Sequence, residues 1–219
     1  MKRYVDLKDI SDGKLYGEED MVKADCLDCS GCSKCCRGMG NSILLDPYDV
    51  WRLTGGLSCS MEGLLSQYAE LNVAEGVILP NLKMTGEEEK CSFLNENGRC
   101  SIHSFRPGLC RLFPLGRYYE NGSYRYFLQT GECDHQRVKI KVKKWIDEPK
   151  DKRYKEFILS WHEVVNHMEE LVRNNEEDEY RKNLNMLFLR LFYLMPYQKE
   201  ASFYEQFEER RSRFYEAVS

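Results

Sequence analysis

The sequence predicts a mixed α+β fold, mostly α-helical, in which an irregular cysteine-rich core with short hairpins precedes a C-terminal helical subdomain. All ten cysteines of the 219-residue chain lie in its first two thirds. The same part holds two Asn-Gly pairs, which favour two-residue hairpin turns. Beyond them, apolar residues recur at helical spacing. We therefore expect an N-terminal arm at 1–25, a cysteine-cluster domain at 26–135 and a helical subdomain at 150–219 packed on that domain.

The first regular elements after the cysteine run are expected to be two helices. Asp46-Pro47 predicts a helix start, because Asp is a good N-cap and Pro is tolerated at the first helical position. Gly55-Gly56 predicts the end of this helix. Apolar spacing predicts a second helix at about 60–72, and extended chain is expected at 77–84 around a proline.

Two hairpins follow, each turned on an Asn-Gly pair. The first spans residues 91–102. Because a hairpin brings its two ends together, it would place Cys91 beside Cys100. A short helix at 104–114, with proline near both ends, separates it from the second hairpin at 118–127.

The character of the sequence changes after the second hairpin. Apolar and basic residues alternate at 138–142, and no cysteine follows. Apolar positions at helical spacing predict helices at about 154–172, 177–195 and 200–217. The middle helix is apolar nearly all round near its end, so we expect it to be buried.

Composition excludes several classes of protein. The first residues, Met1 to Leu7, lack the apolar run of a signal peptide, and no stretch reaches the length of a membrane span. The net charge of −4 gives no argument for nucleic acid. We therefore expect a cytoplasmic protein that binds neither nucleic acid nor a membrane.

Five of the cysteines fall within eleven residues, Cys26 to Cys36. Thiols this dense have three competing explanations: a disulfide scaffold, a zinc site or an iron–sulfur site. A cytoplasmic protein of this size needs no disulfides to fold, so metal or redox chemistry is favoured. Thiolates are soft ligands that select zinc, copper(I) or iron–sulfur clusters. We therefore expect the irregular core to be a metal-binding one.

The spacing inside this run is partly that of an iron–sulfur protein. From Cys26 it is C-x2-C-x2-C-x3-C, the bacterial ferredoxin run. Arg37 stands where that run has proline, and no second run exists, so a plain ferredoxin is not expected. The adjacent Cys35 and Cys36 are expected to project in different directions, which favours two neighbouring metal sites.

Residues 29–36, Cys-Ser-Gly-Cys-Ser-Lys-Cys-Cys, resemble the signature of the YkgJ-type CxxCxxCC cysteine-cluster family, described as zinc- or iron-chelating. The resemblance extends to about residue 135 and is sharpest at 106–114, which is similar to the family's RPxxCRxFP segment. His103 is a departure, because an aromatic residue is expected there. The resemblance implies eight metal ligands, enough for two four-cysteine sites: Cys29, Cys32, Cys35, Cys36, Cys91, Cys100, Cys110 and Cys133.

Several residues near these ligands have open roles. Arg106 and Arg111 are expected to bind the cofactor by donating to its sulfurs or neutralising its charge, with surface salt bridges as the alternative. His103 and His135 flank expected ligands, but hydrogen bonding is favoured over ligation. Of the two remaining cysteines, Cys59 is expected to be a small buried residue, and the role of Cys26 stays open.

The functional hypothesis is a metal-binding protein that holds iron–sulfur clusters, most simply 4Fe–4S, for redox chemistry or protein modification. The family's neighbourhood includes flagellin lysine N-methylases, so the resemblance implies methylation of lysine on a flagellin-like protein substrate. An iron–sulfur oxidoreductase acting on a redox partner is the other possible enzyme. The alternative without catalysis is a zinc-binding structural or interaction module, or a metal-delivery protein.

Overall fold

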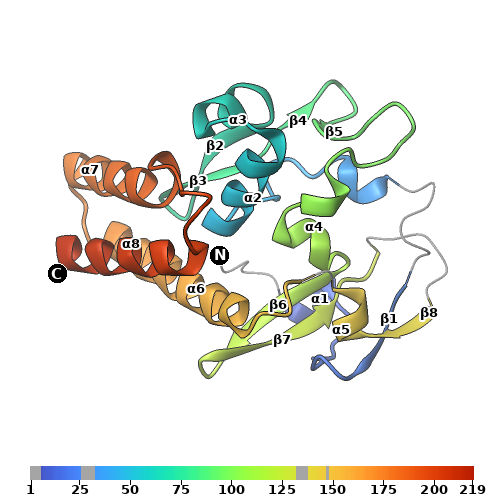
Figure 1. The fold of residues 1–219 in the computed structure, drawn as a ribbon. Helices are drawn as coiled ribbons and strands as arrows, with labels where there is room; N and C mark the ends of the chain where they lie inside the picture. The colour runs from blue at the N-terminus through green and yellow to red at the C-terminus, as the bar shows by residue number, and fades with distance from the viewer. Residues whose placement is uncertain (1–5, 26–32, 132–137, 147) are drawn as a thin grey trace. The chain divides into compact units, whose positions relative to one another are not determined.

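The computed structural model describes residues 6–25, 33–131, 138–146 and 148–219. Helices and small antiparallel sheets together make a mixed α+β fold, which confirms that part of the predicted fold class (Figure 1). Within the described residues each sheet has two strands. No helix of this described part has the length and apolar character needed to cross a membrane.

The chain forms two compact units, and each is assembled from two separate stretches of sequence. Residues 44–83 and 151–219 make the first, which we call the helical unit. The described residues of 2–43 and 84–150 make the second, which we call the cysteine unit. The stretch 44–83 therefore groups with the C-terminal helices and not with the chain on either side of it.

The first helix of the helical unit, α2 (Pro47–Leu57), begins where the sequence predicts. The carboxylate of Asp46 accepts from the Asp49 N–H at 2.7 Å, and the Asp49 side chain accepts from the Asp46 N–H, which is a capping box. The predicted end at Gly55-Gly56 is wrong. The helix continues through both glycines and ends at Ser58, which takes the left-handed conformation.

The second predicted helix is only partly present. Helix α3 (Met61–Gln67) is followed by strand β2 (Ala69–Ala74), which pairs with β3 (Val77–Leu82). The turn between the strands uses Glu75 and Gly76, both at positive φ. This two-residue hairpin turn takes residues 69–74 into a sheet, so the prediction of helix to residue 72 is wrong. The extended chain expected around residues 77–84 is confirmed by β3.

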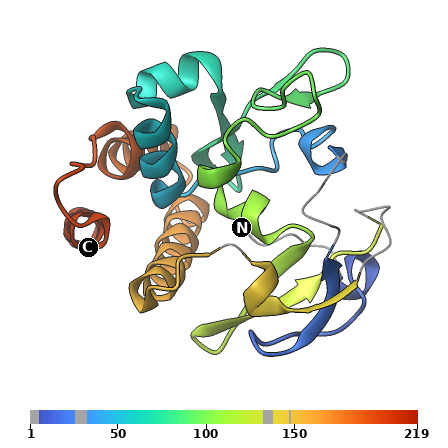
Figure 2. The same cartoon turned by 45° about the vertical axis from the view of Figure 1, so that its right-hand side comes forward.

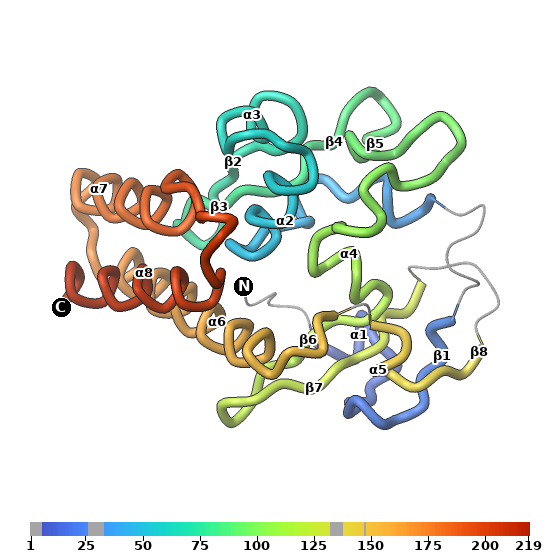
Figure 3. Tube along the Cα trace, viewed as in Figure 1, coloured from blue at the N-terminus to red at the C-terminus, as the bar shows by residue number. Residues whose placement is uncertain are grey.

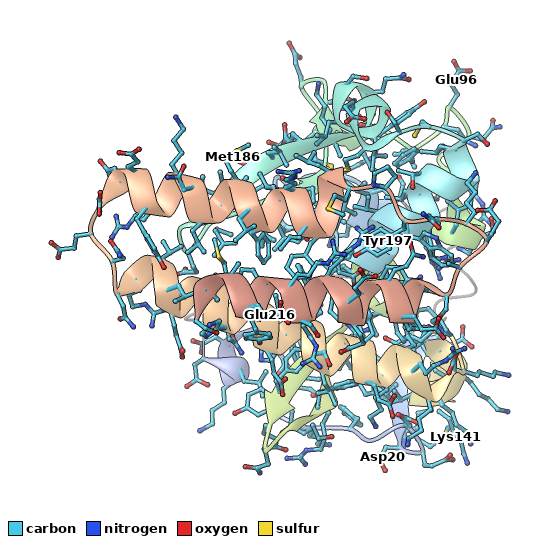
Figure 4. The ribbon with its side chains drawn as sticks, turned by 60° about the vertical axis from the view of Figure 1, so that its left-hand side comes forward. Asp20, Glu96, Lys141, Met186, Tyr197 and Glu216 are labelled. Atoms are coloured by element: carbon cyan, nitrogen blue, oxygen red, sulfur yellow. The ribbon has the colours of Figure 1, made fainter. Side chains whose placement is uncertain are left out.

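Three helices complete this unit and confirm the three predicted for the tail (Figure 3). They are α6 (Lys152–Arg173), α7 (Asp178–Leu189) and α8 (Phe203–Val218). A π-helical turn, Arg190–Leu194, extends α7. Figure 4 shows α7 and α8 side by side, with Tyr197 in the connection between them.

The core of the helical unit is built largely from aromatic rings. The Phe157 and Phe207 rings meet edge to face at 4.7 Å, and Trp161 meets Phe192 at 5.3 Å. Tyr48 on α2 joins this cluster through contacts with four rings of the C-terminal helices, one of which is Phe157. The aromatic residues of the tail are therefore core residues, since most are nearly inaccessible to solvent.

The cysteine unit contains the second predicted hairpin, β6 (Leu115–Glu120) and β7 (Ser123–Leu128). Its turn residues Asn121 and Gly122 both have positive φ, as the predicted type of turn requires. The prediction of this hairpin is confirmed. Its physical basis is that an Asn-Gly pair adopts positive φ at little cost.

The N-terminal residues belong to the cysteine unit. After the short helix α1 (Leu7–Ile10), Tyr16 forms an antiparallel bridge with Tyr126 of β7. Strand β1 (Met21–Asp25) then pairs with β8 (Val138–Lys141), and the two lie side by side in Figures 1 and 2. This part of the expected arm is therefore paired chain, with its inward-facing side chains buried.

The rest of the cysteine unit consists of short elements joined by turns. The helix predicted at 104–114 is split into a 3-10 turn and a short α-helix, because the chain is extended at Arg106-Pro107. The short elements of the unit are the 3-10 helices η1 (Lys34–Cys36) and η2 (His103–Phe105), strands β4 (Met84–Thr85) and β5 (Lys90–Cys91), and helices α4 (Gly108–Leu112) and α5 (Val142–Trp145).

Candidate metal centre

Five of the described cysteines lie in the cysteine unit, and none of the described cysteines is in a disulfide. They come from separate elements: Cys35 and Cys36 from η1, Cys91 from β5, Cys100 from the loop before η2, and Cys110 from α4. The other predicted ligands, Cys29, Cys32 and Cys133, lie outside the described residues, as do Cys26 and His135.

Backbone pairing brings the end of η1 to the start of the 91–102 loop. Arg37 forms an antiparallel bridge with Lys90, and the Gly38 N–H donates to the Glu89 carbonyl at 3.0 Å. The Glu88 carboxylate accepts from both basic side chains of this bridge. Because Arg37 follows Cys36 and Lys90 precedes Cys91, this pairing places the two cysteines on neighbouring segments of the chain.

The 91–102 loop closes on itself as predicted. Leu94 bridges to Cys100, and the Ser101 N–H donates to the Phe93 carbonyl at 2.9 Å. The turn differs from the predicted one, because Gly98 has positive φ but Asn97 does not. The loop therefore brings its two cysteines into the same region without forming a regular two-stranded ladder.

The thiols from these segments interact with one another. A hydrogen bond with the Cys36 thiol, and then burial, raises the pKa of the Cys35 thiol. Burial is the main cause that raises the pKa of Cys91 and of Cys100, and the nearby Cys35 raises both further. This interaction between the two thiols runs against the expectation that Cys35 and Cys36 project in different directions. We call these four residues the thiol cluster.

Two backbone N–H groups point at sulfur atoms of the thiol cluster. The Phe93 N–H donates to Cys91 and the Ile102 N–H donates to Cys100, and each bond lowers the pKa of the thiol that accepts it. In both cases the donor lies two residues after the cysteine. Donors of this kind stabilise thiolates, the form that binds metals. The sequence signal for them is the repeated pattern Cys-Ser followed by a buried apolar residue.

Arg106 supplies positive charge to the thiol cluster. Its guanidinium acts to lower the pKa of both Cys35 and Cys100. Its Nη1 lies 2.6 Å from Nε2 of His103, and its Nε is buried without a hydrogen-bond partner among the described residues. Arg111 is 1% exposed and donates to the Arg106 carbonyl at 3.4 Å. The surface-salt-bridge alternative therefore does not hold for the buried Arg111.

The other two described cysteines are not among the four residues of the thiol cluster. Cys110 is half-buried on α4 of the cysteine unit. Cys59 belongs to the helical unit, where it follows the C-cap of α2 and is half-buried, so it is less covered than predicted.

The thiol cluster fits a soft metal in its chemistry. It offers sulfur ligands, backbone N–H donors to sulfur and one guanidinium with an unsatisfied donor, which suit a negatively charged metal–thiolate group. Across the described ranges, no group of three or more His, Cys, Asp or Glu side chains is arranged closely enough to hold a metal ion.

Comparison with known proteins gives one match. A family model described as "CxxCxxCC: Putative zinc- or iron-chelating domain" matches residues 28–144, more than half of the chain. No curated protein and no solved structure matches the sequence.

Proposed function

The chain belongs to the CxxCxxCC family of zinc- or iron-chelating domains, and from this premise we propose that it holds iron–sulfur clusters. A four-iron cluster takes four thiolates, so eight cysteines suit two such clusters. The proposed ligands are Cys29, Cys32, Cys35, Cys36, Cys91, Cys100, Cys110 and Cys133.

One observation supports this proposal above the others: thiols from two segments distant in sequence, η1 and the 91–102 loop, interact with one another, and the Arg106 guanidinium acts on a thiol of each. Buried inert cysteines would need neither the backbone donors to sulfur nor the charge of Arg106. A disulfide framework would pair these cysteines, whereas none of the described cysteines is in a disulfide. Metal chelation explains the three features together.

Iron–sulfur clusters are proposed over zinc because of what surrounds the sulfurs. Hydrogen bonds to sulfur and nearby charge are the features by which a protein sets the reduction potential of a cluster. When bound, such a cluster supplies one-electron transfer. The residues of this chain would hold it, keep it from solvent and balance its charge. Zinc is the second candidate, since four thiolates also make a tetrahedral structural site.

The experiment that separates these metals is anaerobic purification of the full chain, followed by metal analysis and visible absorption. A brown protein with several irons and sulfides per chain supports the proposal. A colourless protein that retains about two zinc ions per chain contradicts it and supports the zinc module. Rapid loss of metal to a chelator, with the chain still folded, supports metal delivery.

Activity is a separate step of the proposal. The resemblance implies methyl transfer to lysine of a flagellin-like protein, and the alternative is electron transfer to a redox partner. Metal-loaded protein incubated with flagellin and S-adenosylmethionine tests the first, with methylated lysine detected by mass spectrometry. A loaded protein that leaves flagellin unmodified but is reversibly reduced and reoxidised supports the second.

A further inference from the structure

His103 contacts the guanidinium of Arg106, which acts on the thiol cluster. Its Nε2 lies 2.6 Å from Arg106 Nη1, three residues along the chain. A guanidinium nitrogen is always a donor, so the imidazole nitrogen facing it must be the acceptor. The imidazole thereby accepts a hydrogen bond from one of the two terminal nitrogens of the Arg106 guanidinium.

Other contacts restrict the same arginine. It is the last residue before Pro107, whose preference for extended chain ends the 3-10 turn at this point. Its carbonyl accepts from the buried Arg111 side chain at 3.4 Å. Both ends of Arg106, backbone and guanidinium, are therefore held by neighbouring residues.

The Nε–H of Arg106 has no acceptor among the described residues, although it is buried. A buried N–H without a partner is energetically unfavourable, so such a group indicates an acceptor that is missing. Two groups on which its charge acts, Cys35 and Cys100, would be thiolates in a metal complex. A metal-bound thiolate accepts hydrogen bonds, so it is an acceptor of the kind that this donor lacks.

We propose that His103 is a positioning residue, which holds the Arg106 guanidinium so that its Nε–H donates to a thiolate when the metal is bound. This inference rests on the proposed metal site. It gives a role to the residue at which the sequence departs from the family's aromatic. An aromatic ring fills the same space but offers no in-plane acceptor to Nη1.

The expected consequence concerns the metal complex itself. A complex with several thiolates is negatively charged, and a fixed N–H donor stabilises it by hydrogen bonding and by charge. Losing a residue that orients such a group typically lowers metal affinity about 10- to 100-fold. His103 should therefore affect the affinity of the protein for the metal, and the absorption spectrum of the metal complex, without being a metal ligand.

The test compares two substitutions of His103 in the reduced full-length protein, with Co²⁺ as the probe. In His103→Gln the amide oxygen can still accept from Arg106, whereas His103→Phe restores the aromatic and removes the acceptor. We expect His103→Phe and Arg106→Gln to lower Co²⁺ affinity about tenfold or more and to shift the sulfur-to-cobalt charge-transfer band. His103→Gln should recover most of the affinity. Arg99→Gln, which removes an exposed arginine beside Cys100, is the charge control and should have little effect.

The outcomes separate this inference from the proposed function. If the wild-type protein binds neither Co²⁺ nor iron, both are wrong. If wild type binds but His103→Phe matches it in affinity and spectrum, only the positioning role is wrong. If His103→Gln loses metal as fully as Cys100→Ser, His103 is itself a ligand and the inference is overturned. Circular dichroism of each variant confirms that the comparison is made between folded proteins.

Discussion

Arg117 of β6 and Glu148, in the segment after α5, form an ion pair whose side chains are only 10% and 9% exposed. The Tyr126 hydroxyl donates to the same carboxylate at 3.4 Å, and the Trp145 indole N–H donates to the Phe113 carbonyl at 3.2 Å. These contacts lie within the cysteine unit and attach its last residues to the β6–β7 hairpin.

Substituting Glu148→Gln should destabilise the cysteine unit strongly. The change removes the negative charge beside the nearly buried Arg117 guanidinium, which typically costs about 3 kcal/mol or more. Urea unfolding of the full chain measures this loss. The matched control is Glu156→Gln, which breaks the exposed pair with Lys152 and should leave the free energy of unfolding nearly unchanged. Equal effects of the two changes would contradict the role of the buried pair.

Gly116→Ala should also destabilise the cysteine unit. Gly116 pairs with Phe127 across the hairpin, and a Cβ at this position would lie 2.3 Å from the end of the phenyl ring. The ring or the strand must shift, at a typical cost of about 1–3 kcal/mol. Thermal unfolding of the variant measures the loss.

The same substitution at Gly55 serves as the control, because it should raise the stability that Gly116→Ala lowers. Gly55 lies inside α2, and a Cβ there would meet no atom within 4 Å. Because alanine favours helix more than glycine does, Gly55→Ala should stabilise the helical unit by about 0.5–1 kcal/mol. Loss of stability in both variants would show that the contact with Phe127 is not the cause.

The β6–β7 hairpin should lose stability at alkaline pH. Burial raises the pKa of Tyr124 to about 12, and burial raises that of Tyr126 as well. In the unfolded chain these phenols ionise near pH ~10. Between about pH 10 and 12 the unfolded state therefore binds fewer protons than the folded state, and stability falls as pH rises. Tyr124→Phe should make this fall shallower, as measured by urea unfolding at several pH values. Identical pH dependence in the two proteins would contradict the assignment.

Cys110→Ser should lower metal content as much as Cys32→Ser does. Both residues are proposed ligands, and a serine hydroxyl is a poor substitute for a thiolate on a soft metal. Cys59→Ser is the control, because Cys59 lies in the helical unit and outside the proposed ligand set. Metal analysis after anaerobic purification gives the result. Full metal content in Cys110→Ser would remove this residue from the ligand set.

Local sequence signals predicted the elements whose geometry is set locally. The capping residue Asp46 marked the start of α2, and the apolar period marked α6. The pair Asn121-Gly122 gave its expected turn, but Asn97-Gly98 did not. The second pair lies in a loop with a single bridge, where no ladder of paired strands imposes hairpin twist on the turn.

The thiol cluster was only partly predictable, because contacts between distant segments assemble it. The sequence identified Cys91 and Cys100 as neighbours from the loop between them. It could not show the bridge from Arg37 to Lys90, or that His103 contacts Arg106. These contacts depend on the tertiary packing of the segments, which no spacing rule specifies.

The interleaving of the two units has a consequence for biosynthesis. Because each unit combines two stretches separated by the other, neither can finish folding while the ribosome has made only its first stretch. Residues 2–43 must wait for 84–150, so the first cysteines leave the ribosome well before Cys91 and Cys100 exist to join them. If the proposed ligands are correct, their nascent thiols must stay reduced during that interval, and metal loading of the proposed centre can only follow synthesis of most of the chain.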